Sequence, residues 1–588
     1  MNKPSGSLFD FPLIARVLRL AAPYRISFYS AIALSLLLAL LSPVRPYLVQ
    51  LALDKYIVKS DAHGLLLTTV AMLALLIFET FARYYFTYLT AWLGASIIQD
   101  LRIHVFSHLL SSKLQYFDTT PVGTSTTRTI TDVEAINDTF SEGLITIFAD
   151  ILTIVIVAAY MFFVNWKLAL VSLSTLPILL WVTRWFQRGV KSSFMDERTQ
   201  IGRLNAFLQE HITGMRIIQL FNIEKKEQQK FDAINAELTN ANVRGIWYYS
   251  LFFPAVEILL ATGIGLMVWA ATRDILHGLA TVGVISSFIM LINMLFRPLR
   301  FIADKVNTIQ RGIVAAERVF KLIDTDKTIP DHGTKILQRA KGAIDFNNVW
   351  FAYEGDNFVL RNINFHLNAG ETLAVVGATG SGKTSTISLL GRFYDIQQGT
   401  IAIDGTDIRD YRLADLRHQM GIVLQDVFLF AGSIMENITL RNPEISRERV
   451  LAATQALGAH EFIMRLPGNY DYKVMERGAT LSMGQRQLIS FARALVYDPA
   501  ILILDEATSS IDTESEFIVQ RAIEKLVVGR TSVVIAHRLS TIRHAHKIAV
   551  LDKGELKEFG THEELMERNG FYRKLYEMQF NKERLQKV

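Results

Sequence analysis

Long apolar runs in the first half of the chain constrain its fold more strongly than any other feature of the sequence. A helix needs about 20 mostly apolar residues to cross the hydrocarbon core of a bilayer. Candidate spans lie at residues 26–44, 65–78 with an extension past Glu79, 143–166, 168–183, 245–272 and 278–296. These runs predict six membrane-spanning helices, and an even number of spans places both termini on the same side of the membrane.

The connections between the spans alternate in length and in positive charge. The short ones, near residues 54–63, 165–167 and 273–277, together hold four Lys and Arg residues. The long ones, 93–142 and 184–244, hold three and ten, and the segment up to Arg25 holds four. Because positively charged loops stay on the cytoplasmic side, we place the long loops and both termini in the cytoplasm.

Helical patterning continues through the long loops, which lack clusters of turn residues. We therefore expect the spanning helices to extend well beyond the membrane. At the N-terminus, residues 9–25 alternate apolar groups with Arg16 and Arg19. This pattern fits either an amphipathic helix in the membrane interface or a plain connecting helix.

The clearest charged residues within the spans are Glu79, Arg83, Asp150 and Glu257. A charge in hydrocarbon is costly unless it faces protein, water or a partner. Glu79 and Arg83 lie four residues apart, on one helix face, so we expect them to pair with each other. Glu257 is the better candidate for a substrate cavity.

Composition excludes several classes of function. The net charge is only +5, with dispersed basic residues, so no basic stripe is available for nucleic acid. This balance suits a protein that faces anionic lipid in the cytoplasm. The chain has no cysteine, which excludes disulfides, thiolate metal sites and cysteine nucleophiles. The N-terminal segment also lacks the pattern of a cleaved signal peptide, so we expect the first span to direct insertion.

A phosphate loop follows a predicted strand at residues 373–376. Residues 377–384 read Gly-Ala-Thr-Gly-Ser-Gly-Lys-Thr, which fits the pattern GxxxxGK[ST] in full. In such a loop backbone N–H groups close around phosphate oxygens, the lysine reaches the β- and γ-phosphates, and the Ser or Thr hydroxyl coordinates Mg²⁺. The predicted ATP contacts are Gly377, Gly380, Ser381, Gly382, Lys383, Thr384 and Ser385.

A second predicted strand, at residues 500–504, ends in two carboxylates. Asp505 can hold Mg²⁺, and Glu506 can orient or deprotonate the attacking water. An apolar run before Asp-Glu is weak evidence for an ATP-hydrolysing site when it stands alone. After a full phosphate loop it is strong evidence. We therefore predict a multidomain chain, with an N-terminal interfacial helix at 1–25, an all-α six-helix transmembrane domain at 26–325, a linker at 326–342 and an α/β nucleotide-binding domain at 343–588.

Residues 481–487 read Leu-Ser-Met-Gly-Gln-Arg-Gln, and at this segment the chain resembles the ATP-binding cassette (ABC) exporters. The resemblance covers nearly the whole chain and implies the type IV exporter fold. It implies that Ser482, Gly484 and Gln485 belong to a signature segment, which completes the ATP site of the opposite subunit with a hydroxyl and helix N-terminal amides.

The same resemblance assigns further roles in the order in which the residues occur. Tyr353 would stack on adenine, Gln425 would link Mg²⁺ to the membrane domain, Asp512 would contact the nucleotide, and His537 would sense the γ-phosphate. The implied catalytic residues are Glu506 and His537, and the implied Mg²⁺ ligands are Thr384, Gln425 and Asp505.

Each of these matches has an ordinary alternative when it is taken alone. Tyr353 fits a packing tyrosine, Gln425 a polar loop residue and His537 a histidine near a strand end. For His537 the predicted strand at 533–535 gives separate support, because α/β sheets bind ligands at the carboxyl ends of their strands.

Two cytoplasmic segments, 116–123 and 221–226, resemble the coupling helices of these exporters. The resemblance implies that they contact nucleotide domains near Gln425. Residues 476–478 resemble the loop that reports the ATP state to those helices, although Met475 stands where glycine is usual.

Met483 is the largest departure from the family pattern, because it stands where the signature segment usually has glycine. Glycine permits close approach and unusual dihedral angles, so we expect the methionine to perturb phosphate contact. An altered signature beside an intact Glu506 resembles one half of a heterodimeric exporter with two unequal ATP sites. The alternative is a homodimer that tolerates Met483.

The favoured function is ATP-driven export of amphipathic drugs or lipids across the cytoplasmic membrane, by a dimer in which this chain supplies half of each ATP site. A homodimeric lipid or peptide exporter is an alternative, and a nucleotide-gated channel or regulator is a further one. The six apolar runs argue against a soluble cassette ATPase. Nothing in the sequence distinguishes among drug, lipid and peptide as substrate.

Overall fold

A computed structural model describes residues 11–276, 280–325, 329–505, 513–536 and 542–586 of the 588-residue chain. Its internal contacts divide the chain into two compact units. Unit 1 comprises Met1–Leu110 and Val122–Asp326, and unit 2 comprises Ser111–Pro121 and Lys327–Val588. Unit 2 therefore includes a short segment that comes from between the second and third spans.

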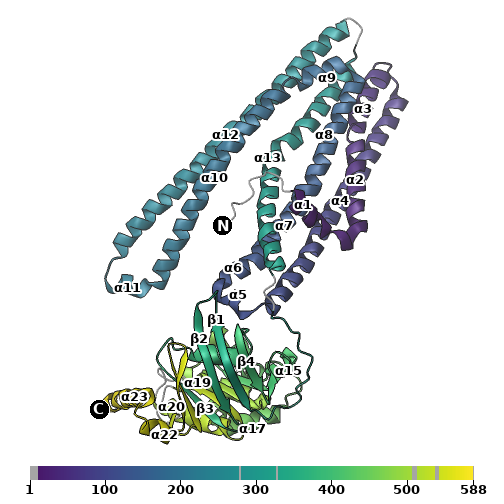
Figure 1. Cartoon of the computed structure of the whole chain (residues 1–588). Coiled ribbons are helices and arrows are strands. Elements are labelled where there is room, and N and C mark those ends of the chain that lie inside the picture. Colours follow the sequence, from purple (N-terminus) through teal and green to yellow (C-terminus); the bar gives the residue numbers. More distant parts are fainter. Residues whose placement is uncertain (1–10, 277–279, 326–328, 506–512, 537–541, 587–588) are drawn as a thin grey trace. The chain divides into compact units, whose positions relative to one another are not determined.

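Unit 1 is helical (Figure 1). Among the described residues six helical stretches are long and apolar enough to cross a membrane, as the sequence predicted: Ala22–Ile57, Ala62–Ser111, Val122–Val164, Trp166–Thr213, Glu224–Leu276 and Val282–Leu299. Its helices are α1 (Phe11–Arg19), η1 (Ala22–Tyr24), α2 (Arg25–Leu41), α3 (Val44–Leu51), η2 (Ala52–Ile57), α4 (Ala62–Ser111), α6 (Val122–Thr127), η3 (Arg128–Asp132), α7 (Val133–Asp138), η4 (Thr139–Leu144), α8 (Ile145–Val164), α9 (Trp166–Leu173), α10 (Leu176–Thr213), α11 (Met215–Leu220), α12 (Glu224–Leu276) and α13 (Val282–Asp324).

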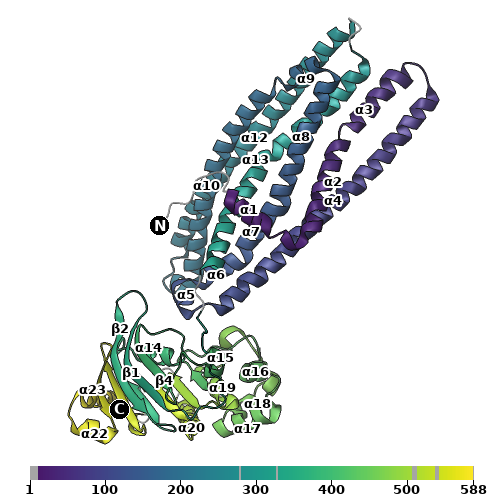
Figure 2. The same ribbon diagram turned by 45° about the vertical axis from the view of Figure 1, so that its right-hand side comes forward.

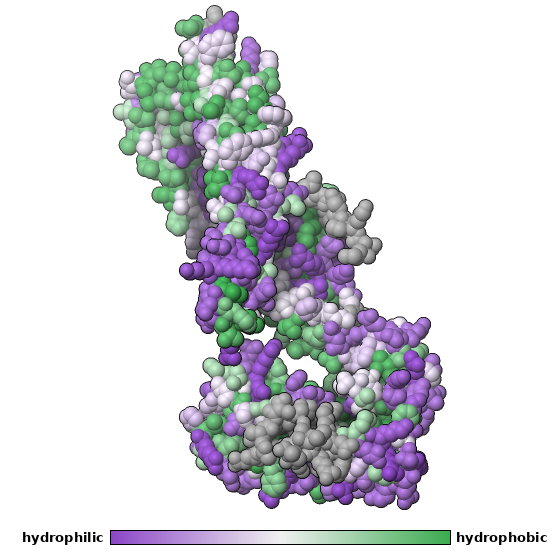
Figure 3. Space-filling model, turned by 90° about the vertical axis from the view of Figure 1, so that its left-hand side faces the viewer, coloured by the Kyte–Doolittle hydropathy of each residue, from purple (hydrophilic) through white to green (hydrophobic). Residues whose placement is uncertain are grey.

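Several of these helices are longer than a membrane crossing requires. With 50 residues, α4 is about 75 Å long, whereas the hydrocarbon core is about 30 Å thick. The paired helices α10 and α12 have 38 and 53 residues and are joined by the short α11. In Figure 3 hydrophobic surface covers the upper end of this unit, and hydrophilic residues dominate its lower part. The helices thus continue past their apolar stretches, as the loop patterning predicted.

Two predicted boundaries of the spans are wrong. The third apolar run was expected to include Trp166, but that residue begins α9, because Asn165 ends α8 and caps the next helix by accepting bonds from the N–H groups of Lys167 (3.1 Å) and Leu168 (3.2 Å). The first connection was expected to begin near Asp54, but the helical stretch continues to Ile57.

Asp54 has a structural role at the start of the sixth span. Its carboxylate accepts a bond from the hydroxyl of Thr281 at 2.6 Å and another from the N–H of Gly283 at 2.8 Å. A carboxylate at a helix N-terminus satisfies free N–H groups and interacts favourably with the helix dipole. The end of the first span is thereby fixed to the start of α13.

The ion pairs of the structure concern two sets of the charged residues within the spans, Asp150 and the pair Glu79 and Arg83. The Asp150 carboxylate, on α8, pairs with the Lys305 ammonium on α13, so this intramembrane charge has a partner. Among the ion pairs of the described residues, none joins Glu79 to Arg83, although the charge of Arg83 still acts on the Glu79 carboxyl. Near the N-terminus, Arg16 of α1 forms two bonds with Asp324 (2.5 and 2.6 Å), which fasten α1 to the end of α13.

A buried hydrophobic cluster of unit 1 lies among the third, fourth, fifth and sixth spans. Phe186 of α10 and Phe252 of α12 stack with ring centroids 4.0 Å apart, and both are buried. Phe288 and Leu291 of α13 are buried in the same cluster. Dispersion contacts of this kind hold spanning helices together, since lipid gives helices no hydrophobic reason to associate.

Unit 2 is an α/β structure (Figure 2). Its described residues form a six-stranded sheet of order β12-β11-β3-β10-β9-β6, a four-stranded antiparallel sheet of order β2-β1-β4-β5, and the pair β7-β8. The strands are β1 (Ile344–Ala352), β2 (Phe358–Leu367), β3 (Thr372–Val376), β4 (Gln398–Ile403), β5 (Thr406–Asp407), β6 (Met420–Val423), β7 (Gly432–Ser433), β8 (Lys473–Val474), β9 (Ile501–Asp505), β10 (Thr531–Ile535), β11 (Lys547–Asp552) and β12 (Glu555–Gly560).

Helices cover the sheets of unit 2. They are α5 (Leu114–Thr119), α14 (Lys383–Leu390), α15 (Leu413–His418), α16 (Ile434–Thr439), α17 (Arg447–Leu457), α18 (His460–Met464), η5 (Asn469–Asp471), η6 (Glu476–Gly478), α19 (Met483–Tyr497), α20 (Thr513–Val527), α22 (His562–Glu567) and α23 (Phe571–Gln586). All five residues of β3 and of β10 are buried, as expected for parallel strands covered on both faces.

Candidate nucleotide site

The site forms at one edge of the six-stranded sheet. Strands β3, β10, β9 and β6 run parallel, so their carboxyl ends meet at the same edge. Register places Ile535, near the end of β10, beside Val375 of β3 and Asp505 of β9. Ligands of open α/β sheets bind at this edge. The phosphate loop, residues 377–384, follows β3 here.

Backbone geometry explains two of the loop glycines. Gly377 has φ +155°, and a Cβ there would lie 2.2 Å from the carbonyl oxygen of Leu551. Gly382 has φ +102° and caps α14 from the left-handed region. Side chains rarely adopt such conformations, so glycine lets the loop turn directly into the helix. The loop's N–H groups then gather at the N-terminus of α14, where an anion is favoured.

Lys383 is held above this loop. Its side chain is 8% exposed, and its Nζ donates to the carbonyl oxygens of Gly377 (2.8 Å) and Ala378 (3.0 Å). Burial lowers the pKa of Lys383, and the negative charge of Asp505 opposes that shift. An anion in the loop would supply further counter-charge to this buried ammonium.

A buried hydroxyl in the loop also fits a phosphate ligand. The Oγ of Ser381 is buried and has no hydrogen-bond partner among the described residues. Buried polar groups are normally paired, so this atom calls for a ligand or water. The residues of the phosphate loop therefore fit a nucleotide phosphate.

Oxygen donors suited to Mg²⁺ stand at the same edge. Thr384 is exposed at the second position of α14, Asp505 ends β9, and Gln425 is exposed two residues after β6. Hydroxyl, carboxylate and amide oxygens are ligands that Mg²⁺ accepts. The chemistry of this set fits the metal that the sequence predicts. Glu506, Asp512 and His537 lie outside the described residues.

Tyr353 stands in an aromatic cluster beside the loop. Its ring meets Phe351 edge-on at 4.8 Å and Tyr394 edge-on at 5.2 Å. Its hydroxyl forms a 2.9 Å hydrogen bond with Ser385 of α14. The structure thus brings two of the predicted ATP contacts together, and Tyr353 is 36% exposed.

The short helix α5 contacts this aromatic cluster. The amide of Gln115 donates to the backbone oxygen of Tyr353 at 2.8 Å. The hydroxyl of Tyr394 donates to the carboxylate of Asp118. The resemblance implied contacts near Gln425, whereas the side chains of Gln115 and Asp118 bond to Tyr353 and Tyr394. Sequence reasoning missed Tyr394, because a tyrosine four residues past a helix end carries no recognisable signal.

The signature segment lies at the N-terminus of α19. Ser482 is the N-cap: its Oγ accepts from the N–H of Gln485 (3.3 Å), and its own N–H donates to the Gln485 side chain (3.0 Å). This reciprocal capping box leaves the Ser482 side chain exposed at the helix end, whereas Gly484 is buried. No hydrogen bond or ion pair among the described residues links Ser482 or Gln485 to the phosphate loop.

Met483 needs no unusual backbone conformation. It is the first residue of α19, and it is not among the residues with positive φ. The backbone at this position therefore does not use the dihedral freedom that glycine would permit, because the capping box sets a normal helix start. The expected perturbation of phosphate contact stays a prediction. What remains different from glycine is the bulk of the side chain.

Residues 476–478 are tied to the signature helix. Arg486 of α19 donates to the carbonyl oxygen of Arg477 at 3.4 Å, and a Cβ on Gly478 would lie 2.8 Å from the Arg486 side chain. Movement of this loop would therefore disturb α19. The contact gives a physical basis for the reporting role that the resemblance implied.

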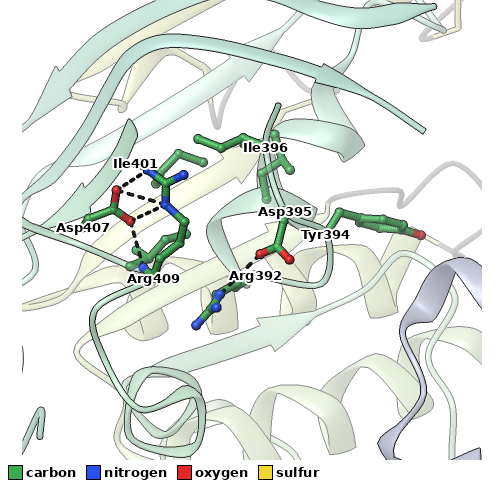
Figure 4. A pocket seen from close by; sticks show the side chains of 9 residues that line it. Arg392, Tyr394, Asp395, Ile396, Ile401, Asp407 and Arg409 are labelled. Atoms are coloured by element: carbon green, nitrogen blue, oxygen red, sulfur yellow. Dashed lines mark hydrogen bonds and ion pairs between the residues drawn. The ribbon is translucent and has the colours of Figure 1, made fainter. Parts of the chain in front are cut away.

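A small cavity near the end of α14 does not resemble a phosphate site (Figure 4). Its lining includes Arg392, Asp395, Asp407 and Arg409. Arg409 pairs with Asp407 at 2.6 Å, and Arg392 lies 3.5 Å from Asp395. Both arginines are already balanced by carboxylates, so the cavity offers no net positive charge to an anion.

Comparison with known proteins agrees with this geometry. The family model for the ABC transporter transmembrane region matches residues 28–299, and the ABC transporter model matches residues 360–509. An ATP-dependent lipid A-core flippase from Syntrophus aciditrophicus (strain SB) is 37% identical over 574 residues, which cover 97% of this chain and 95% of that protein. The chain belongs to the ABC transporter family.

Other ABC transporters show similar coverage. A putative multidrug export ATP-binding/permease protein, YgaD, from Bacillus subtilis (strain 168) is 35% identical over 575 residues, covering 96% of this chain and 99% of that protein. The solved structure of a bacterial Atm1-family ABC exporter with ATP bound superposes with a TM-score of 0.75 at 28% identity, covering 95% of this chain and 99% of that one. This chain is thus an ABC exporter half-transporter of the type IV fold, an ATPase coupled to translocation that requires a partner subunit.

Proposed function

We propose that this ABC half-transporter exports amphipathic small molecules, drugs or lipids, across the cytoplasmic membrane. One observation carries the proposal: the phosphate loop, Asp505 and the end of β10 meet at one sheet edge, in a chain that also has six membrane helices. The names of its relatives, a lipid A-core flippase and a multidrug export protein, support this substrate class. The cytoplasmic placement of both termini and of the long loops rests on the charge of the loops.

Each residue of the site has a proposed role. Lys383 and the loop N–H groups bind the phosphates, and Tyr353 stacks on the base. Thr384, Gln425 and Asp505 hold Mg²⁺, which would neutralise charge on the phosphates when bound. Glu506 orients or deprotonates the attacking water, and His537 contacts the γ-phosphate. The Ser482 hydroxyl and the N-terminus of α19 complete the site of the partner.

The partner is proposed to be a different chain. Support comes from the side chain of Met483, at the end of the helix that would face the partner's phosphate. This chain would combine its own Glu506 with the partner's signature segment in a strong site, and Met483 would cap a weaker one. Co-purification from the native host tests this proposal. Recovery of this chain only, with full ATPase activity as a dimer, contradicts it.

Glu506→Gln in the full-length transporter, assembled with its co-purified partner in proteoliposomes, tests the export function. We expect ATP binding to persist while hydrolysis falls about 100-fold or more, because a general base contributes at least that much. ATP-dependent movement of a fluorescent lipid analogue and of a cationic dye should stop. Glu524→Gln, at an exposed site on α20, is the matched control and should leave turnover unchanged.

Two outcomes would contradict the proposal in different ways. Near-normal hydrolysis by the Glu506→Gln protein places the base elsewhere. Wild-type protein that hydrolyses ATP but moves neither probe contradicts the proposed substrate class.

A further inference from the structure

The hairpin formed by α10, α11 and α12 is held by three ion pairs that bridge its two long helices. Moving toward α11, they are Asp196 with Arg244 (3.2 Å), Arg203 with Glu237 (3.1 Å) and His211 with Glu227 (2.8 Å). Residue numbers rise on α10 as they fall on α12, as expected for antiparallel helices in a fixed register. We call each of these ion pairs a rung, and the His211–Glu227 rung is the one nearest to α11.

This last rung differs from the other two in burial. The side chains of His211 and Glu227 are 18% and 12% exposed, whereas those of Arg203 and Glu237 are 60% and 58% exposed. Exposed pairs contribute little because water and salt screen them. The shielded rung is therefore the one expected to hold the hairpin.

Both ring nitrogens of His211 face acceptors. Nδ1 lies 2.8 Å from the backbone oxygen of Phe207, and Nε2 lies 2.8 Å from the Glu227 carboxylate. A carbonyl oxygen and an ionised carboxylate can only accept hydrogen bonds. Each nitrogen must therefore carry a proton, so the geometry is that of an imidazolium. Neutral His211 would lose one of the two bonds.

The surrounding groups favour that charge. The ring of His211 stacks on Phe207, with centroids 3.6 Å apart. The Glu227 carboxylate, with Glu210 of α10 as a smaller cause, raises the pKa of His211. On the far side of Glu227, Lys230 lies 2.8 Å away and, with His211, lowers the pKa of Glu227. If the bond to His211 were lost, Glu227 would still be paired with the Lys230 ammonium.

The rung closes the segment that carries α11. His211 and Glu227 are 16 positions apart, and α11 (Met215–Leu220) lies between them. None of the residues of α11 is buried. Besides the His211–Glu227 pair, a backbone bond from the N–H of Ile223 to the oxygen of Ile218 (3.2 Å) and the ring contact of Phe207 with Phe231 (6.1 Å) hold this end of the hairpin. We propose that His211 and Glu227 are positioning residues that hold α11 in its docking orientation toward a nucleotide domain, and that this hold exists while His211 is protonated.

The direction of the pH effect follows from the raised pKa of His211. A group whose pKa is raised by folding contributes stability at low pH and loses it as the pH rises through the raised value. The lowered pKa of Glu227 keeps the carboxylate ionised into more acidic solution. The rung is thus intact between these two limits, and alkaline pH weakens the hold on α11, because neutral His211 keeps only one of its two bonds and loses its charge.

Backbone hydrogen exchange of residues 212–226 tests this inference in the full-length transporter without nucleotide. After correction for intrinsic rates, exchange in the wild type should rise about five-fold between about pH 6 and about pH 9, because local opening sets the rate. The His211→Gln and Glu227→Gln proteins should exchange rapidly at both pH values. Arg203→Gln, which breaks the neighbouring exposed rung, should behave like the wild type.

Equal corrected exchange of the wild type at both pH values would overturn the inference. It would also fail if Arg203→Gln released the segment as much as His211→Gln. The claim that α11 docks on a nucleotide domain rests on the proposed function. It is tested separately, by measuring the ratio of substrate-stimulated to basal ATPase activity. A wild type without ATPase activity would contradict the proposed function but leave the exchange result standing.

Discussion

The two short cytoplasmic helices α5 and α11 have six residues each but differ in what their side chains meet. On α5, Tyr116 is buried, Gln115 bonds to the backbone of Tyr353, and Asp118 accepts the Tyr394 hydroxyl. On α11 nothing is buried, and Leu220 at its end is 78% exposed. Helix α5 therefore contacts other residues of this chain, whereas α11 exposes apolar side chains.

The difference indicates where a second subunit is needed. Exposed apolar side chains that gather at one place mark interaction sites in soluble regions. Ile217, Leu220 and Phe221 are all more than half exposed at the tip of a hairpin that extends beyond its apolar stretches. A partner that covers them would gain about 25 cal/mol for each Å² of apolar surface buried. Helix α5 belongs to this chain's own nucleotide-binding unit, whereas the apolar side chains of α11 stay uncovered among the described residues.

The largest expected effect is at α11. Leu220→Asp should reduce substrate-stimulated ATPase activity and transport about 30-fold, because a charge at the centre of an apolar contact costs about 2 kcal/mol or more. Proteoliposome assays measure both quantities. Val528→Asp, at a site 75% exposed between α20 and β10, should have no comparable effect. If Leu220→Asp transports normally, α11 is not a docking element, and the exposure of its apolar side chains does not mark an interaction site.

A smaller effect is expected at α5. Asp118→Asn and Tyr394→Phe each weaken or remove the same hydrogen bond, so the double variant should lose no more than either single one. We expect a loss of about 1 kcal/mol, or about five-fold in the ratio of substrate-stimulated to basal ATPase activity. Tyr497→Phe removes a comparable bond to Thr439 away from α5, and it should leave that ratio unchanged. Additive losses would show that Tyr394 and Asp118 act separately.

The smallest expected effect separates the two helices by pH. Burial, and then the bond to Asp118, raise the pKa of Tyr394, so its hydroxyl remains a donor in alkaline solution and the α5 contact persists. The coupling ratio of the wild type should nevertheless fall about two- to three-fold between about pH 7 and about pH 9, because His211 loses its proton. Asp118→Asn should keep this fall, and His211→Gln should abolish it. A fall that survives in the His211→Gln protein would place the titrating group elsewhere.

The phosphate site could be predicted from sequence because its geometry is local. The spacing of Gly377, Gly382 and Lys383 follows from a strand, a tight turn and a helix start, all within a few residues. The six spans are similarly readable, because about 20 consecutive apolar residues are a property of a single segment. The expected strand at 533–535 corresponds to β10, which ends beside β3 and β9.

Contacts between distant segments could not be predicted in this way. Tyr394 and Asp118 are 276 positions apart, and no periodicity links them. Glu79 and Arg83 are adjacent on one helix face, yet shared position did not produce an ion pair. The normal helix start at Met483 follows from capping residues that are visible in the sequence, Ser482 and Gln485. The effect of the Met483 side chain on phosphate contact stays a prediction.

The inclusion of Ser111–Pro121 in unit 2 has a consequence for engineering chimeras of such transporters. The chain enters the nucleotide-binding unit once, returns to the membrane helices, and enters it again at Lys327. Exchanging only the C-terminal portion for that of a relative would replace the aromatic cluster around Tyr353 and Tyr394 and leave this chain's own α5 against a foreign surface. A functional exchange would have to carry both segments. The graft therefore needs a junction at each end of the α5 segment in addition to the one after the sixth span.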